Sequence, residues 1–344
     1  MDNIEQENNI KDSSNKDIIP EDTKNSDDFE SKKIEFKKIS SKLGDNSEVY
    51  FPSISTNYSN NLKKNNKPKY ILPTVFKLDF SDEKLNYLYS KEYLDEIYIN
   101  FLLEEQNLIK IIKKDYMNNQ NEINEKMREI LVDWLIEIHN QFHFKRKTLF
   151  QTILIIDLYL SQKIIHTVQL QLLGTACLLI SCKGNEIFVP SIDQFLGLAS
   201  NQYSKKELLR MELLVMQTLN FEIFYPTCEE YFNIISTVYN FNKVQHHFGE
   251  YFLDSSLIDY KMLKNPPSTI ALSCAYIVMK FFGLDGYKDL YKSKLISGNA
   301  TGITIKECAK DLCFLVKNLP NTHLTATKLK YSSQEFENVA GLCQ

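Results

Sequence analysis

The chain has 344 residues, 43% of them hydrophobic, and a formal net charge of −4. This length predicts about two domains, each with enough apolar residues to bury a core. The slightly acidic balance argues against a general nucleic-acid-binding protein, because such proteins carry a basic excess. The sequence has no signal-peptide core and no run of about 18 apolar residues, so we expect an intracellular, soluble protein.

The N-terminal part of the chain has few aromatic residues and no sustained apolar period. Residues 1–68 are crowded with Asn, Ser, Asp, Lys and Glu. Such a segment cannot bury enough apolar surface to offset the entropy lost on ordering, so we expect a disordered tail. Residues 69–122 are predicted to form a linker and a helix, since apolar residues recur at helical spacing within 86–112.

Helical periodicity continues almost without a break to the C-terminus, and strand patterns are nearly absent. We therefore predict an all-α protein. Besides the helix in 86–112, the expected helices cover residues 123–143, 147–162, 167–183, 190–200, 204–219, 226–240, 242–262, 267–283, 303–318 and 323–340. Ser204 followed by Glu207 predicts a capping box, and Pro190 with Ser191 fits the first turn of a helix.

The helical pattern starts again after Pro226. The small-residue run from Ser268 to Tyr276 is similar to the sequence GTACL at 174–178. Small residues allow the close helix contacts that a central helix needs. Two five-helix units of similar length, covering residues 123–225 and 226–344, are the simplest account of this repetition.

The residues that usually carry chemistry do not form a catalytic pattern. The seven cysteines include no CxxC pair, which predicts reduced thiols packed as small hydrophobic groups. The six histidines show no metal-ligand spacing, and the sequence has no phosphate-binding loop or nucleophile elbow. We therefore expect no enzyme activity, no metal and no cofactor.

The stretch MREILVDWL at 127–135 is the most informative in the chain. Met127, Ile130, Leu131 and Trp134 fall at i, i+3, i+4 and i+7, so a helix would place them in one apolar stripe. Arg128 and Asp133 are charges inside this apolar run, which predicts that each has a partner. The chain has only three arginines.

This stretch closely resembles the signature that opens the cyclin box of A- and B-type (mitotic) cyclins. Further motifs follow in the family's order: LQLLGTA at 170–176, KGNEIFVP at 183–190, LNF at 219–221, LIDY at 257–260, PPS at 266–268 and LKYSS at 329–333. The resemblance covers about residues 90–340. It implies two tandem five-helix cyclin boxes, a preceding helix, and a subunit that activates a cyclin-dependent Ser/Thr kinase.

The resemblance also implies which residues bind the kinase. In the family, the first box and the preceding helix hold the kinase's regulatory C helix, and Lys183 and Glu212 match a charged pair that hydrogen-bonds kinase carbonyls. The other matching positions are Glu186, Ile187, Leu213, Met216, Phe221, Ile223, Tyr93, Ile97 and Phe101. Core packing is an alternative for each apolar member. For the charged pair, the alternative is a surface salt bridge worth at most about 1 kcal/mol.

A second implied site is a shallow groove for Arg-x-Leu motifs of substrates or inhibitors. The matching residues are Met127, Ile130, Leu131, Trp134, Glu137, Leu170 and Gln171. The apolar stripe would take the leucine, and Glu137 would take the basic residue. The alternative is that the stripe is core, and its depth of burial distinguishes the two. The resemblance places Arg128 outside this groove, in a buried structural ion pair with Asp157.

The chain departs from the family directly after Lys183. The family usually has an aromatic residue and a glutamate there, whereas this chain has Gly184 and Asn185. Gly184 fits a left-handed position that would end the third helix, and losing the aromatic contact would change affinity and partner choice. The first 127 residues contain no arginine, so they hold no Arg-x-x-Leu destruction box, and no Lys-Glu-Asn triplet occurs in the chain.

Together these features predict a cell-cycle kinase regulator of the nucleus and cytoplasm, without nucleic-acid or membrane partners. Two alternatives remain open. One is a cyclin-fold transcription factor that bridges promoter DNA and polymerase, although the sequence lacks a basic surface and an N-terminal cysteine zinc ribbon. The other is a scaffold that binds a kinase without activating it, which the change at Gly184 leaves open.

Overall fold

The computed structural model describes residues 93–287, 290 and 302–343, and these residues form helices and no β-strand. The all-α prediction is confirmed. The predicted tail at 1–68 and the segment from 69 to 92 lie outside the described residues.

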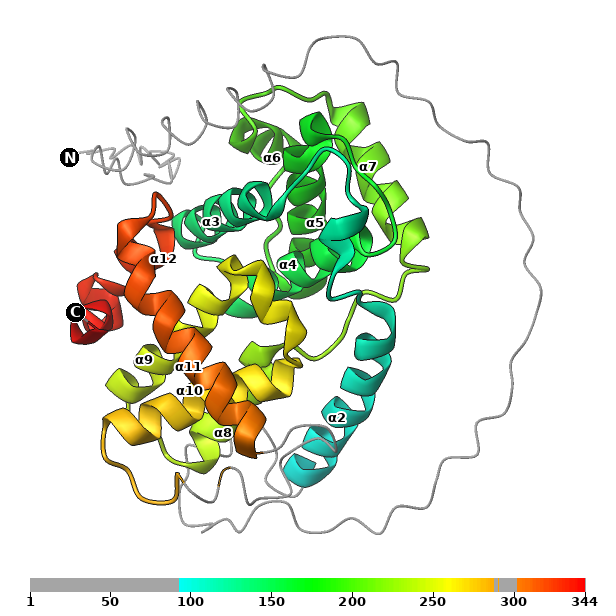
Figure 1. Cartoon of the computed structure of the whole chain (residues 1–344). Coiled ribbons are helices and arrows are strands. Elements are labelled where there is room, and N and C mark those ends of the chain that lie inside the picture. Colours follow the sequence, from blue (N-terminus) through cyan, green and yellow to red (C-terminus); the bar gives the residue numbers. More distant parts are fainter. Residues whose placement is uncertain (1–92, 288–289, 291–301, 344) are drawn as a thin grey trace, which may run out of the picture. The chain divides into compact units, whose positions relative to one another are not determined.

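The first repeat is built around its third helix. Its helices are α3 (Glu125–Gln141), α4 (Arg146–Leu160), α5 (Leu170–Asn185), α6 (Ile192–Leu198) and α7 (Lys205–Thr218). Every residue of α5 from Leu170 to Cys182 is buried, and α5 contacts each of the other four helices (Figure 1). A helix that is apolar on all sides is stable only when neighbours surround it, so the composition of α5 places it at the centre.

Short polar side chains determine where the helices around α5 begin. Ser191 and Ser204 accept hydrogen bonds from the backbone N–H groups of Gln194 and Glu207, and the side chains of Gln194 and Glu207 accept in return from the cap residues. Each capping box satisfies two N–H groups that a helix start otherwise leaves without partners. The predicted start of α7 is therefore confirmed, whereas α6 begins at Ile192, because Ser191 caps the helix instead of lying with Pro190 in its first turn.

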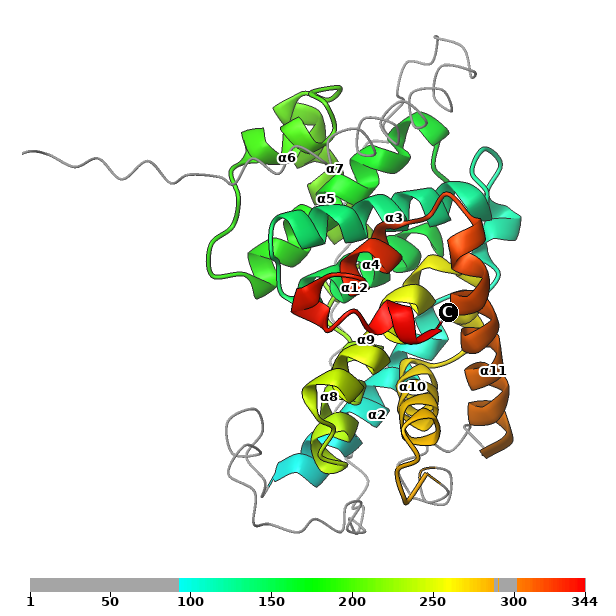
Figure 2. The same cartoon turned by 90° about the vertical axis from the view of Figure 1, so that its left-hand side faces the viewer.

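The second repeat has the same plan. Its helices are α8 (Cys228–Val238), α9 (Lys243–Ile258), α10 (Pro267–Phe281), α11 (Gly302–Asn318) and α12 (Ala326–Tyr331). Small residues of α10 such as Ser268, Ala271 and Ala275 are buried, and α10 contacts α8, α9 and α11 (Figure 2). The predicted pair of five-helix units is confirmed, with α10 holding the place that α5 holds in the first repeat.

The last predicted helix, at 323–340, is wrong in its extent. α12 ends at Tyr331, and two 3-10 turns follow, η7 (Gln334–Phe336) and η8 (Val339–Cys343). Between them Glu337 and Asn338 have φ angles of 54° and 48°. These left-handed angles interrupt a right-handed helix, so the C-terminal residues fold back instead of continuing α12.

The preceding helix, α2 (Leu94–Ile111), packs on the second repeat. The rings of Tyr98 and Phe101 contact the ring of Tyr231 in α8 edge-on, with centroids 5.5 and 5.7 Å apart. The buried carboxylate of Glu105 accepts hydrogen bonds from the backbone N–H and the hydroxyl of Ser268, at 2.7 and 2.8 Å. Burial raises the pKa of Glu105. Glu105 therefore caps the N-terminus of α10 from another part of the chain.

The two charges inside the MREILVDWL stretch join α3 to the second repeat. Arg128 forms a buried ion pair with Asp157 of α4 at 2.7 Å, and its Nη1 donates to the carbonyls of Leu257 and Ile258 at the end of α9, at 3.0 and 3.2 Å. Asp133 accepts a hydrogen bond from the backbone N–H of Ala326, the first residue of α12, at 3.0 Å. Both charges thus satisfy helix termini of the other repeat.

A third polar contact between the repeats centres on Arg146, the first residue of α4. Its guanidinium lies 2.8 Å from Glu250 and 2.8 Å from Asp254, both on α9. Asp254 also pairs with Lys330 of α12 at 2.8 Å.

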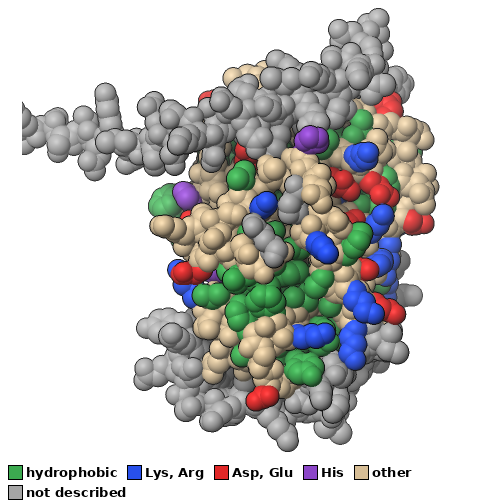
Figure 3. Space-filling model, turned by 60° about the vertical axis from the view of Figure 1, so that its left-hand side comes forward, with side chains coloured by type: hydrophobic (Ala, Val, Ile, Leu, Met, Phe, Trp, Pro, Cys, Tyr) green, Lys and Arg blue, Asp and Glu red, His purple; other side chains and the backbone are tan. Residues whose placement is uncertain are grey.

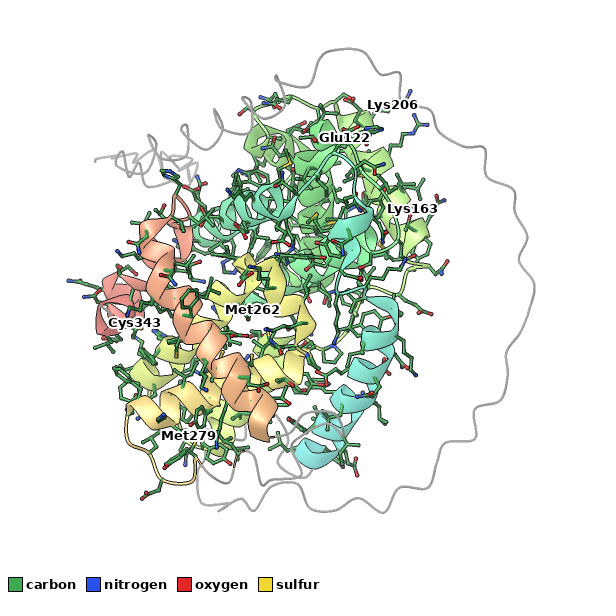
Figure 4. The ribbon with its side chains drawn as sticks, in the orientation of Figure 1. Glu122, Lys163, Lys206, Met262, Met279 and Cys343 are labelled. Atoms are coloured by element: carbon green, nitrogen blue, oxygen red, sulfur yellow. The ribbon has the colours of Figure 1, made fainter. Side chains whose placement is uncertain are left out.

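The short turn η5 (Tyr260–Lys264) contacts both α3 of the first repeat and α9 of the second. In Figure 4, Lys206 of the first repeat and Met279 of the second lie far apart, and Met262 of η5 lies between them.

None of the cysteines among the described residues forms a disulfide. Burial raises the pKa of Cys177 and Cys274 far above the ordinary value, as expected for thiols packed in a core. Among the described residues, no helix is long and apolar enough to cross a membrane, and no group of His, Cys, Asp and Glu is arranged to hold a metal ion.

Candidate functional site

The charged pair predicted from the sequence lies on the surface of the first repeat. Lys183, in the last turn of α5, donates from Nζ to the carboxylate of Glu212 on α7 at 2.5 Å. The lysine is exposed and the glutamate is largely covered. An ammonium group with three donors and one protein partner keeps donors for another molecule.

The chain after Lys183 is anchored to the start of α4. The carboxylate of Glu186 accepts from the backbone N–H of Lys145 at 2.8 Å and from the hydroxyl of Thr148. In the reverse direction, Lys145 Nζ donates to the carbonyl of Asn185 at 2.7 Å. Glu186, predicted as a kinase-facing residue, therefore caps α4 in this structure. That role depends on a partner 41 positions away, which the sequence does not indicate.

This anchored segment presents apolar side chains to solvent. Ile187 is 81% exposed and Phe188 is 88% exposed. Phe188 is not among the residues predicted from the sequence. The run of Ile187, Phe188 and Val189 before Pro190 is the signal that could have identified it, because no helical period places these three side chains in a core. Isolated apolar side chains on a surface are common, but adjacent large ones indicate a contact site.

The end of α7 extends this surface. Leu213 and Phe221 are exposed, and Met216 is half-buried. Ile223 differs from its predicted role, because it is only 3% exposed and its carbonyl accepts a hydrogen bond from the side chain of Gln151 in the core. Ile223 therefore serves packing in this structure, while its neighbours in sequence face outward.

An open groove of about 590 Å³ lies between α2 and the segment that follows α7. Its walls are residues 221–225 on one side and Glu104, Asn107, Lys110 and Ile111 of α2 on the other. Figure 1 shows the ends of α7 and α2 along the same side of the molecule. Of the three residues predicted at the preceding helix, Tyr93 lies directly before α2 and is exposed, and Ile97 and Phe101 of α2 are half-buried.

Gly184 does not end α5 in a left-handed conformation, so that prediction is wrong. α5 continues to Asn185, and the glycines with positive φ in the described residues are Gly283 and Gly286. Gly184 instead lies against the ring of Phe224. A Cβ atom at residue 184 would lie 2.6 Å from Cζ of Phe224, so a side chain there would displace this exposed ring.

The residues predicted to form the Arg-x-Leu groove are divided between core and surface. Trp134 is 1% exposed, and Leu131, Leu170 and Gln171 are buried as well. Met127, Ile130 and Glu137 are half-buried. Four of the seven residues therefore belong to the packing of α3 on α5 in this structure, and the accessible part of the predicted groove consists of the other three.

A separate apolar groove lies in the second repeat, away from the predicted residues. It is lined by side chains of α9, α10 and α11 and by the C-terminal residues, including Phe281, Val316 and Leu342, with Lys317 and Lys328 beside them. On the face drawn in Figure 3, hydrophobic side chains gather over the C-terminal half with lysines nearby.

Comparison with known proteins places this architecture in a family. The profile described as "Cyclin, N-terminal domain" matches residues 96–224, and "Cyclin, C-terminal domain" matches residues 226–344. Cyclin-B2-1 of Oryza sativa subsp. japonica is 32% identical over 251 residues, which are 73% of this chain and 59% of that protein. G2/mitotic-specific cyclin-2 of Medicago sativa is 30% identical over 249 residues, 72% of this chain and 75% of that protein.

A solved structure agrees at the level of the fold. The X-ray structure of a viral cyclin from herpesvirus saimiri covers 63% of this chain and 97% of that chain, with a TM-score of 0.53 and 18% sequence identity. Tandem five-helix repeats, each around a buried central helix, define the cyclin fold. The chain belongs to the cyclin family, and the relatives named above are B-type and G2/mitotic-specific cyclins.

Proposed function

We propose that this cyclin is the regulatory subunit of a cyclin-dependent Ser/Thr kinase in cell-cycle control, and that it activates the kinase by positioning its C helix. The observation that carries the proposal is the surface Lys183–Glu212 pair together with the exposed apolar side chains that follow each member in the chain. Ile187 and Phe188 follow Lys183, and Leu213 and Phe221 follow Glu212. A charged anchor surrounded by large apolar side chains is the composition of a protein-binding surface.

Activation would be conformational, and the kinase would supply all of the catalytic groups. A cyclin that holds the C helix keeps the kinase's lysine–glutamate pair aligned with its metal-binding aspartate. Moving a kinase from about 1% active to about 99% active requires roughly 5.5 kcal/mol of preferential binding to the active state. An interface of about 1,600 Å² or more, partly apolar, is large enough to supply this difference.

Removing the charged pair should weaken kinase binding without unfolding the cyclin. We expect Lys183→Ala combined with Glu212→Ala to raise the Kd for a purified cyclin-dependent kinase catalytic subunit at least about tenfold, because hydrogen bonds from a charged group are worth roughly 1.5–3 kcal/mol. The melting temperature should stay unchanged, since an exposed pair contributes about 1 kcal/mol or less. Calorimetric titration and thermal unfolding measure the two quantities.

The exposed pair Lys243–Glu337 of the second repeat, at 2.9 Å, offers a matched control. Its double alanine variant should bind the kinase like the wild type. Equal loss in both variants, or no loss in either, would contradict the assignment of the site. A phosphorylation assay on a histone substrate separates an activating cyclin from a scaffold, because a scaffold would bind the kinase and leave its rate unchanged.

We also propose that the first repeat recruits substrates or inhibitors carrying Arg-x-Leu motifs. The support is the sequence match of α3 to the family's docking stripe, together with the accessibility of Met127, Ile130 and Glu137. The half-buried Ile130 would contact the motif's leucine, and Glu137 would contact its arginine.

We also propose that this cyclin acts in the nucleus and the cytoplasm.

Substitution of Ile130 tests docking without disturbing the core. We expect Ile130→Ala to weaken an Arg-x-Leu peptide several-fold, since loss of apolar contact area costs about 25 cal/mol per Å². Fluorescence anisotropy with a labelled peptide measures this change. Trp134→Ala is unsuitable, because truncating a buried tryptophan costs about 3–5 kcal/mol of stability. Ile187→Ala is the control: it should weaken kinase binding and leave peptide binding intact. Unchanged peptide affinity in Ile130→Ala would reject this docking site.

A further inference from the structure

Gly184 and Phe224 are a matched pair on the proposed kinase-binding surface. Gly184 follows Lys183 in the last turn of α5, at a position where the resemblance to the family implies an aromatic side chain. The ring of Phe224 reaches this position from the segment after α7. A Cβ atom at residue 184 would lie 2.6 Å from Cζ and 3.0 Å from Cε1 of that ring. The ring therefore occupies the space into which a side chain at residue 184 would project.

Contact with Gly184 does not bury Phe224, which remains 56% exposed. The same side chain lines the open groove between residues 221–225 and α2, together with Phe221. Phe224 thus contacts the end of α5 next to Lys183 and also lines the groove. An exposed phenylalanine contributes little to folding, so the stability of the isolated cyclin gives no reason for an aromatic residue here.

A ring placed against a glycine backbone is held from one side before any partner arrives. Such preorganisation reduces the entropy lost on binding. Large aromatic side chains near the centre of an interface contribute more to affinity than most of their neighbours. Phe224 contacts Gly184, the neighbour of Lys183, and lines the groove, so its ring adjoins both parts of the proposed surface.

We propose that Phe224 is an affinity-determining contact of this cyclin with its kinase, and that its ring takes the place of the aromatic side chain missing at residue 184. This inference rests on the proposed kinase-binding function. A side chain at residue 184 would displace the Phe224 ring from its present position, so the two rings would compete for the same space.

The test is an exchange of the two side chains. Phe224→Ala should raise the Kd for a purified cyclin-dependent kinase catalytic subunit at least about tenfold, with an unchanged melting temperature. The double variant Gly184→Phe/Phe224→Ala should recover binding to within a few-fold of wild type, because it returns the ring to the same space from α5. Gly184→Phe alone should bind no more tightly than wild type, since the two rings compete. Phe314→Ala, which removes another exposed phenylalanine from α11, is the control and should have no effect.

Each outcome decides between the proposals. Wild-type affinity in Phe224→Ala overturns the inference, and so does a double variant that binds as weakly as Phe224→Ala while melting like wild type. If Gly184→Phe lowers the melting temperature, Phe224→Leu decides the matter, because an aromatic contact predicts weakened binding and a merely apolar one predicts none. If wild-type cyclin binds no kinase, the proposed function fails. If it binds and the Lys183/Glu212 variant is weakened but the Phe224 variants are not, only the present inference fails.

Discussion

Replacing Asp254 with alanine should destabilise this cyclin by about 3–5 kcal/mol, because the change removes the shared partner of the buried ammonium of Lys330 and the largely covered guanidinium of Arg146. The carboxylate is fully buried on α9. It lies 2.8 Å from Arg146 of α4, 2.8 Å from Lys330 of α12 and 2.9 Å from the hydroxyl of Tyr331. A loss of this size is a large fraction of the roughly 5–15 kcal/mol that stabilises a typical domain.

The same contacts give Asp254 a pH dependence with a defined sign. Burial opposes ionisation of Asp254, but the charges of Arg146 and Lys330 overcome it and hold the pKa of this carboxyl well below its ordinary value. A group whose pKa is lower in the folded state stabilises the fold above its unfolded pKa, about 3.9 for aspartate, and loses this contribution as pH falls. The free-energy difference between wild type and Asp254→Ala should therefore be largest at neutral pH and shrink below about pH 4.

Urea unfolding followed by circular dichroism, repeated between neutral and acid pH, measures both effects. Asp311→Ala is the control, because Asp311 pairs with Lys264 on the surface at 2.6 Å and should cost about 1 kcal/mol or less. A cost for Asp254→Ala no larger than this control, or a cost that does not change with pH, would contradict the role assigned to the buried cluster.

Local sequence signals predicted the helices well because the interactions behind them are local. Ser204 and Glu207 are three residues apart and complete one capping box. The mostly apolar run from Leu170 to Ile180 predicted a helix surrounded by others, and the helix is buried as expected. The left-handed angles of Glu337 and Asn338 are the exception, because neither residue is a glycine that would have indicated a break in the last helix.

The candidate site was less predictable, since its geometry depends on residues that are distant in sequence. Family motifs identified Lys183 and Glu212, which lie together as expected. They did not indicate that Glu186 would cap α4 or that Phe224 would cover Gly184, because both contacts require the relative placement of whole helices. The motif also could not predict how deeply the stripe is buried. An apolar stripe such as the one that includes Trp134 has the same residue spacing whether it lines a groove or belongs to the core, and here Trp134 is buried.

Several contacts with the second repeat pair a charged side chain with the end of a helix, and the local sequence does not predict such pairings. Charged side chains of the first repeat or of α2 satisfy helix ends in the second: Glu105 caps α10, Asp133 caps α12, and Arg128 binds carbonyls at the end of α9. Helix ends expose unsatisfied backbone groups, and burying them between repeats requires a polar partner. The position of one repeat on the other is therefore specified by polar contacts within an apolar interface.

Arg128→Met should also have a large effect, because Arg128 contacts residues of both repeats. The change removes the partner of the buried Asp157 and leaves that carboxylate with the hydroxyl of Tyr116, which donates to it at 2.7 Å. It also removes the donors to the carbonyls of Leu257 and Ile258. We expect a loss of about 3–5 kcal/mol, as for other broken buried pairs.

A double-mutant cycle separates the ion pair from the contact with α9. In Arg128→Met combined with Asp157→Leu no buried charge is left alone, so the double variant should be more stable than Arg128→Met by at least about 1 kcal/mol. Lys206→Met, at an exposed position of α7, is the control and should stay within about 0.5 kcal/mol of wild type. If the double variant is no more stable than Arg128→Met, the bonds from Arg128 to the end of α9 carry most of the energy. If Arg128→Met itself behaves like the control, Arg128 does not hold the repeats together.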